Sequence, residues 1–259
     1  GYADVAALGE ISSDDSLATM TDYVQPHRLH MGYSFELLTD DGSPAHIRAT
    51  VEALESQMQG GWPCWAISNH DVQRAVTRWG TGQDDDAHAR QLLALVCALR
   101  GSVCLYQGEE LGLPEAEVPY EALRDPYGKA FWPSFKGRDG CRTPMPWAAH
   151  AHAGFSDATP WLPVPAAHIA RNVEAQAADA GSVLNAARAF LGWRKSQPAL
   201  VEGTIRFLDA PEQLLAFVRE HGDQRLLVAF NLSRQAIAWT PPAASLVLLP
   251  APGVDAAGL

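Results

Sequence analysis

The sequence contains little cysteine, and its cysteines form no pattern that binds a metal. None of the four belongs to a Cys-x-x-Cys pair, the spacing typical of zinc and redox sites. Three of them lie within apolar runs, where a buried free thiol is the usual finding. We predict that the thiols are structural, with a disulfide or a metal site as the alternative. We expect no metal ion and no cofactor.

Basic charge is also scarce. The chain has 19 Lys and Arg against 30 Asp and Glu, a net charge of −11, and its sequence pI is about 5.2. Basic patches supply most of the affinity for nucleic acid, and basic clusters likewise bind anionic membrane surfaces. We therefore expect no nucleic-acid partner and no membrane partner.

Long apolar runs are missing as well. No run has the length of a membrane span, and no signal peptide is visible at the start of the chain. The first residues resemble the middle of a domain, so the lack of a visible signal peptide carries little weight. We predict a cytoplasmic location. The hydrophobic fraction of 47% is nevertheless ample for a folded core.

Short apolar runs alternate with amphipathic helical patterns as far as Gly112. The runs are 5–9, 29–38, 62–68 and 102–106. Between the second and third runs, apolar residues recur at spacings of four, three and four, which predicts a helix from Ser43 to Gln59 with Ser43 as its N-cap. Units of about thirty residues are typical of βαβ folding and a parallel sheet. Four such strands make half of an eight-stranded barrel.

An acidic run, Asp84–Asp86, precedes a helix predicted from 87 to 100. Acids at a helix N-terminus suit the helix dipole. One short run rarely supplies a full calcium coordination shell. We therefore favour capping and solvation over a calcium site.

The pattern changes twice in the second half of the chain. Residues 114–181 are rich in Pro, Gly, Trp and His, and so long an excursion is usually functional, often an active-site wall. A helix is predicted at 182–197. Short strands then predict a small antiparallel β domain, at 204–208, 214–219, 226–231, 236–239 and 246–249. We predict an α/β chain with domains at 1–197 and 198–259.

Two carboxylates stand where parallel strands would end. Glu10 follows the first apolar run, and Ser68-Asn69-His70-Asp71 follows the third. Catalytic groups of a (β/α) barrel occupy the carboxyl ends of its strands, and two acids on one rim suggest acid/base cleavage of a sugar bond. The alternative is helix capping by the Ser-Asn-His-Asp turn and a surface position for Glu10. The preceding buried strand favours a site role for Asp71.

Four segments of the chain resemble the α-glucosidase and oligo-α-glucosidase branch of glycoside hydrolase family 13, the α-amylase family. They are Gly9-Glu10-Ile11, Ser68-Asn69-His70-Asp71, Leu105–Gly112 and Gly-Arg-Asp-Gly-Cys-Arg-Thr-Pro-Met-Pro-Trp at 137–147. The last is long and specific, and the four occur in the family's order. The resemblance implies the second half (strands 5–8) of a (β/α)8 TIM barrel, followed by the family's C-terminal β domain.

The resemblance also implies roles for individual side chains. Glu10 would be the general acid, and Asp71 would stabilise the positive charge that develops on the sugar ring. His70 would donate a hydrogen bond to the sugar hydroxyls. Arg138 would bridge a carboxylate and a sugar hydroxyl through its planar donor group, while Arg142 is expected to form a structural ion pair.

One residue that the family requires is missing from this sequence. The nucleophilic aspartate of these enzymes lies upstream of the general acid, in a Gly-Phe-Arg-x-Asp-like segment, and the nine residues before Glu10 contain none. Glu109 and Glu110 follow the last barrel strand and are assigned to architecture. We expect the C-terminal half of a retaining α-glucosidase that removes terminal glucose from small α-glucosides, with transfer to another sugar as a further outcome. By itself the chain should be inactive, and its partner should be the missing half of the barrel or a second copy.

Two alternatives stay open. One is a sucrose- or trehalose-phosphate-active member of the same family, although no cationic phosphate pocket is evident in the sequence. The other is a non-catalytic relative that acts as a binding partner. Such relatives have generally lost the catalytic carboxylates, whereas Glu10, His70 and Asp71 remain here.

Overall fold

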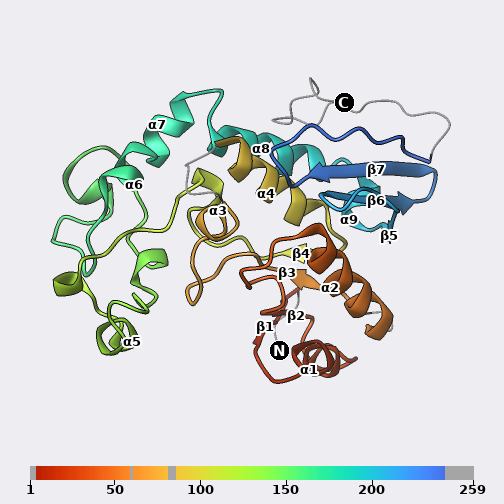
Figure 1. Cartoon of the computed structure of the whole chain (residues 1–259), viewed down its shortest axis with the longest axis horizontal. Coiled ribbons are helices and arrows are strands. Elements are labelled where there is room, and N and C mark those ends of the chain that lie inside the picture. The colour runs from red at the N-terminus through yellow and green to blue at the C-terminus, as the bar shows by residue number, and fades with distance from the viewer. Residues whose placement is uncertain (1–3, 59–60, 81–85, 243–259) are drawn as a thin grey trace. The chain divides into compact units, whose positions relative to one another are not determined.

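The structure is a computed structural model that describes residues 4–58, 61–80 and 86–242 of the 259. Figure 1 shows the course of the chain. The chain forms two compact units, each built from segments that are far apart in the sequence. The units are Gly1–Ala66 with Leu95–Cys104 and Leu191–Leu259, and Ile67–Ala94 with Leu105–Phe190.

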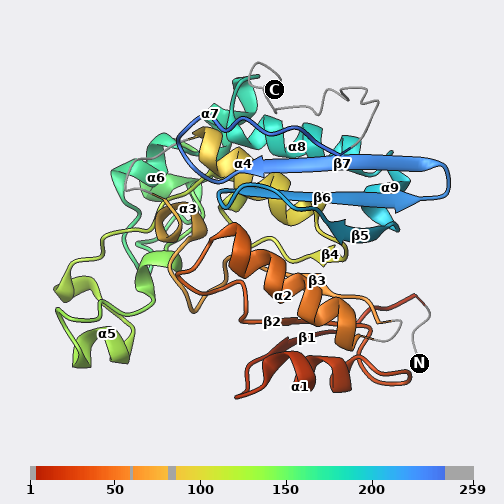
Figure 2. The same ribbon diagram turned by 45° about the vertical axis from the view of Figure 1, so that its right-hand side comes forward.

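The first unit contains the parallel strands. Its elements are β1 (Leu8–Ile11), α1 (Ser16–Tyr23), β2 (Met31–Ser34), α2 (Pro44–Gln57), β3 (Cys64–Trp65), β4 (Ser102–Val103), α9 (Pro198–Val201), β5 (Thr204–Phe207), β6 (Leu214–His221) and β7 (Gln224–Asn231). β1 pairs with β2 and β3 pairs with β4, both in parallel, and β2 lies against β3 (Figure 2). The strands follow one another in the order of the sequence, as in half of a (β/α) barrel. This confirms the predicted fold class.

The first strand begins later than the apolar run that predicted it. β1 pairs with β2 only from Leu8, which lies opposite Met31, and Val5 is exposed. β1 continues to Ile11. Glu10 therefore lies within β1, opposite Tyr33, rather than after its end.

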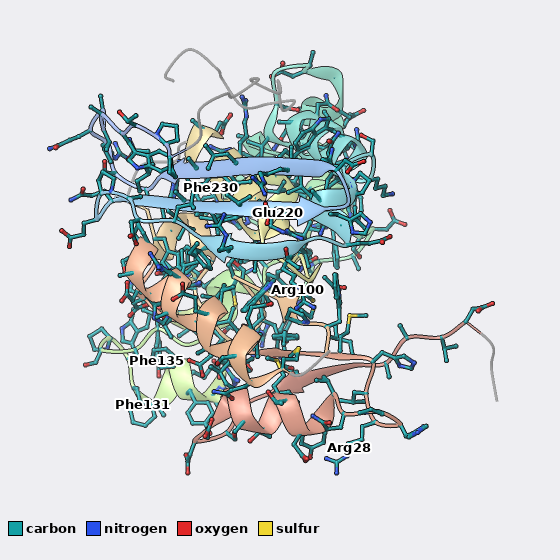
Figure 3. The ribbon with its side chains drawn as sticks, turned by 90° about the vertical axis from the view of Figure 1, so that its right-hand side faces the viewer. Arg28, Arg100, Phe131, Phe135, Glu220 and Phe230 are labelled. Carbon is teal, nitrogen blue, oxygen red and sulfur yellow. The ribbon has the colours of Figure 1, made fainter. Side chains whose placement is uncertain are left out.

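The predicted helix after the second run is present as α2. The Ser43 hydroxyl accepts a hydrogen bond from the backbone N–H of His46 at 3.2 Å, which caps the first turn. The apolar positions Ile47, Val51 and Leu54 are completely buried. Arg100 lies next to α2 (Figure 3). It donates to a Glu55 carboxylate oxygen at 2.8 Å, so the helix is tied to the segment that leads into β4.

The C-terminal part of the first unit is a three-stranded antiparallel sheet in the order β5-β6-β7. The predicted strand at 236–239 is wrong, because that segment is irregular. Asn231 ends β7: its side-chain Oδ1 accepts from the Ser233 backbone N–H, and its side-chain Nδ2 donates to the Gln235 backbone carbonyl. These bonds turn the chain away from the sheet. The predicted strand at 246–249 lies outside the described residues, and the domain boundary after 197 stays a prediction.

The second unit contains short helices joined by long loops. They are α3 (Ala75–Arg78), α5 (Pro126–Ala130), α6 (Ala166–Ala170) and α7 (Val173–Ala178). The sequence division between the units falls after Ala94, within α4 (Asp86–Ala98), and after Phe190, within α8 (Val183–Arg194). The long excursion, residues 114–181, has a core of its own formed by Ala116, Val118, Leu123 and Leu162. Its Met145 packs in another cluster with Leu111, Leu113 and Leu184, which lie just outside it in the sequence. Phe131 and Phe135 are half exposed and point away from the ribbon (Figure 3).

Within the described part of the chain, none of the helices combines the length and the apolar character that a bilayer crossing requires.

Candidate active site

The Ser-Asn-His-Asp loop is folded by its first two side chains. The side-chain Oδ1 of Asn69 accepts from the backbone N–H groups of Asp71 and Val72, at 2.8 and 3.2 Å. The Ser68 hydroxyl accepts from the Ala75 N–H at 3.0 Å, at the start of α3. Capping therefore occupies Ser68 and Asn69, whereas the Asp71 carboxylate serves other contacts.

Two arginines of the 137–147 segment bind the Asp71 carboxylate. Oδ1 of Asp71 accepts from Nη1 of Arg138 at 3.0 Å and from Nη2 of Arg142 at 2.7 Å. His70 Nε2 lies 3.8 Å from the same oxygen, and Arg142 Nε donates to the His70 backbone carbonyl at 2.6 Å. Charge-assisted bonds of this kind are strong and orient the carboxylate. The structure thus brings together three of the predicted site residues, His70, Asp71 and Arg138.

The contacts of Asp71 with Arg138, Arg142 and His70 share one of its oxygens. Its side chain remains 30% exposed, and the three contacts described above involve Oδ1. Arg142 forms the ion pair expected of it, and its partner is Asp71 itself.

Glu10 belongs to the first unit and is exposed on β1. It stands between Gly9 and the buried Ile11, opposite Tyr33 of β2. A β-strand is a rigid support, which suits a group that must be accurately placed. Its role as general acid stays a prediction.

Sequence reasoning missed Asp125, which binds Arg138 from the other side. Its Oδ2 accepts from the Arg138 backbone N–H at 2.8 Å and from Nε at 2.9 Å, and its Oδ1 accepts from Nη2 at 3.1 Å. These contacts with Arg138 lower the pKa of Asp125 to about 2. The sequence signal at this position, Asp-Pro, indicates only a helix start.

Arg74 was also missed, and it links the three loops of the site. It is 2% exposed. Its guanidinium donates to the carbonyls of Gln107 and Cys141, at 2.7 and 3.0 Å, and its backbone N–H donates to Glu115 at 2.9 Å. The loop that carries Asp71 is thereby fastened to the chain after β4 and to the segment that carries Arg138.

Two half-buried acids, Glu109 and Glu115, lie beside Arg74. Burial raises the pKa of Glu109 and that of Glu115 to about 7. Glu109 accepts a hydrogen bond from the Tyr106 N–H at 2.6 Å, an internal contact that supports the architectural role assigned to it. A raised pKa means that the folded state binds the proton more tightly than the unfolded state. The protonated side chains of Glu109 and Glu115 therefore contribute their full stabilisation of the fold below about pH 4.5. That stabilisation is lost as the pH rises through 7.

Glu115→Gln should weaken this pH dependence. Gln keeps an oxygen that can accept from Arg74, but it carries no titrating proton. The free energy of unfolding of the native chain should fall between about pH 5 and pH 8 relative to the variant, by at most about 3 kcal/mol. Urea titrations across that range measure the difference. Glu121→Gln, at an exposed position of the same unit, is the control. Parallel curves for the native chain and Glu115→Gln would contradict the assignment.

Comparison with known proteins gives one consistent family. The family described as alpha amylase, catalytic domain, matches residues 1–203, and the maltogenic amylase C-terminal domain matches residues 205–247. A curated "Probable alpha-glucosidase" of Rhizobium meliloti (strain 1021) is 48% identical over 90% of this chain and 43% of its own length. "Probable oligo-1,6-glucosidase 2" of Bacillus subtilis (strain 168) is 31% identical over 90% of this chain and 48% of its own length. The chain thus spans about half the length of the curated relatives that it matches.

Solved structures agree with this result. The crystal structure of an alpha-glucosyl transfer enzyme is 59% identical and has a TM-score of 0.95, covering 98% of this chain and 48% of the other. A trehalose-6-phosphate hydrolase of Bacillus licheniformis is 27% identical, with a TM-score of 0.76, over 88% of this chain and 47% of the other. The predicted family and barrel architecture are confirmed, and the chain belongs to the α-amylase family of glycoside hydrolases.

Proposed function

We propose that this chain supplies the proton donor and the charge-stabilising carboxylate of a retaining α-glucosidase. The observation that carries the proposal is the Asp71 carboxylate bound by two guanidinium groups, Arg138 and Arg142. An ionised carboxylate fixed beside a sugar ring lowers the energy of the oxocarbenium-like transition state, because its charge is already oriented when positive charge develops.

The reaction proceeds by two displacements. Glu10 gives its proton to the glycosidic oxygen as a nucleophilic carboxylate attacks the anomeric carbon, and a glycosyl-enzyme forms. Glu10 then takes a proton from water, or from a sugar hydroxyl in a transfer reaction, and the glycosyl-enzyme bond breaks. Asp71 stabilises both transition states. His70 and Arg138 hold the hydroxyls of the sugar at the cleaved bond.

The substrate is a terminal α-linked glucose of a small α-glucoside. The names of the relatives support this class, since they include an α-glucosidase and an oligo-1,6-glucosidase. The 59% identical α-glucosyl transfer enzyme supports transfer to a second sugar. The retained residues Glu10, His70 and Asp71 favour an enzyme over a non-catalytic relative.

The nucleophilic carboxylate comes from outside these 259 residues, because no segment of the sequence matches the family's nucleophile motif. Among the described strands, β1 has a ladder partner only in β2, and β4 only in β3. Unpaired strand edges favour association. We therefore infer that a polypeptide with the other barrel strands completes the site, or that two copies associate.

Mixing the chain with such a polypeptide tests the proposal. The complementary piece is the N-terminal half of the 48% identical Rhizobium meliloti protein. The chain alone should not hydrolyse p-nitrophenyl α-glucoside above background, and the mixture should. Turnover by the chain alone would overturn the requirement for an outside nucleophile.

Replacing Glu10 in the mixture tests its role as the general acid. Glu10→Gln should lower kcat/KM for maltose by about 10³-fold but that for α-glucosyl fluoride far less, because kcat/KM reports formation of the glycosyl-enzyme and fluoride leaves without a proton. Equal losses on both substrates would contradict the role of Glu10.

A further inference from the structure

The Arg138 guanidinium is held on its edge and on its face by residues of the second unit. Along the edge, Asp125 accepts from Nε at 2.9 Å and from Nη2 at 3.1 Å. On the face, the Tyr127 ring has its centroid 5.4 Å from the guanidinium carbon. Edge and face contacts together remove the rotations that an arginine side chain otherwise has. Arg138 is thus oriented before any sugar arrives.

Asp125 does more than a helix cap requires. Its Oδ1 accepts from the Tyr127 N–H at 3.1 Å, which caps α5, and a serine or asparagine would serve equally there. Its Oδ2 is engaged entirely by Arg138, through the backbone N–H and Nε. The side chain is completely buried, and burying a charge is costly unless it is paired. Arg138 is the cationic partner that the buried charge requires.

Asp125 is itself fixed in position. Its backbone N–H donates to Oδ2 of Asp139 at 2.8 Å, and Asp139 is 1% exposed. The contact with Arg138 keeps the pKa of Asp125 at about 2, so the carboxylate is ionised throughout the physiological range. The support of Arg138 is therefore rigid and permanently charged.

The three N–H directions of the guanidinium are divided between two carboxylates. Nε and Nη2 bind Asp125, and Nη1 donates to Oδ1 of Asp71 at 3.0 Å. Since the guanidinium is planar, fixing one side fixes the direction of the other. We propose that Asp125 is a positioning residue that aims Nη1 of Arg138 at Asp71. This inference rests on the proposed function, because only glucoside cleavage gives the hydrogen bond between Arg138 and Asp71 a catalytic purpose.

Asp125→Asn separates positioning from capping. Asn keeps an oxygen that caps Tyr127, but its amide N–H groups would face the N–H groups of Arg138 and turn the guanidinium away from Asp71. In the chain mixed with its complementary half, kcat for p-nitrophenyl α-glucoside should fall by about 30- to 100-fold, with KM changed by less than about threefold. A displaced Arg138 affects the transition state more than substrate binding.

Two further variants distinguish the positioning of Arg138 from the loss of a helix cap. Asn172→Ala removes another buried cap, since Asn172 Oδ1 accepts from the Ala175 N–H at 2.8 Å. It should lower the melting temperature without changing kcat. In an Arg138→Ala background, Asp125→Asn should cause no further loss of kcat, because both changes act through the same guanidinium. A kcat for Asp125→Asn within threefold of the native value, or additive losses in the double variant, would overturn the inference.

A second readout separates this inference from the proposed function. If the native mixture shows no turnover, the proposed function fails. The ¹⁵N NMR signal of the Arg138 Nε–H in the full chain then decides the role of Asp125. The signal should be shifted and protected from exchange in the native chain and in Asp71→Asn, and it should lose both properties in Asp125→Asn. A signal unchanged by Asp125→Asn would overturn the inference.

Discussion

Asp71→Asn should lower kcat for α-glucoside cleavage by about 10³-fold in the chain mixed with its complementary half. The amide has the size of the carboxylate but none of its charge, so the developing positive charge on the sugar loses its stabilising partner. Arg138 and Arg142 would also face a neutral group in place of the anion that they bind. The loss should appear in kcat more than in KM, because the charge develops only in the transition state.

The control is a carboxylate of the same unit outside the site. Asp179 is exposed, and its Oδ1 accepts from the Gly181 N–H at 2.8 Å. Asp179→Asn should leave kcat unchanged. Initial rates with p-nitrophenyl α-glucoside give both values. A loss of less than tenfold for Asp71→Asn would remove this residue from the chemistry.

Arg219→Met should lower the free energy of unfolding by about 3 kcal/mol or more. Arg219 lies on β6 and is fully buried. Its guanidinium donates to four backbone carbonyls, those of Ala98, Leu200, Gly203 and Thr204, at 2.6, 3.1, 3.0 and 3.0 Å. Methionine fills similar space but leaves these acceptors without a donor. The carbonyls belong to the end of α4, to α9 and to the approach to β5, so one side chain fastens the sheet to the rest of the first unit.

Arg206→Met is the matched control, because Arg206 is exposed on the neighbouring strand β5. Urea unfolding of the native chain and the two variants measures the effect, and the control should change the free energy of unfolding by less than about 0.5 kcal/mol. Burial lowers the pKa of Arg219 to about 10, so the side chain is charged at neutral pH. A change below about 1 kcal/mol for Arg219→Met would contradict its structural role.

Local patterns predicted much of the fold. The helix after Ser43 follows directly from its cap and its apolar spacing, and both features are present in α2. The parallel pairing of the strands follows from the alternation of runs and helices. The strand at 236–239 failed because the side-chain turn at Asn231 overrides the local β propensity.

The supporting residues of the site could not be predicted in the same way. Asp125 and Arg138 are 13 residues apart, and Arg74 reaches Cys141 across 67 residues. Neither periodicity nor spacing specifies such partners. Asp71 was predicted from its place after a buried strand and from its motif, and Arg138 from its motif alone. The structure adds the hydrogen bond between them. Their catalytic roles, like that of Glu10, stay predictions.

Trapping the covalent intermediate tests the central claim most directly. The chain and its complementary half are incubated with 5-fluoro-α-glucosyl fluoride, which forms a slowly hydrolysed glycosyl-enzyme, and the labelled peptide is identified by mass spectrometry. We predict a single fluoroglucosyl group on a carboxylate of the complementary polypeptide, in its Gly-Phe-Arg-x-Asp-like segment. A label on any carboxylate of this chain, Glu109 included, would show that these residues supply the nucleophile and would contradict the account.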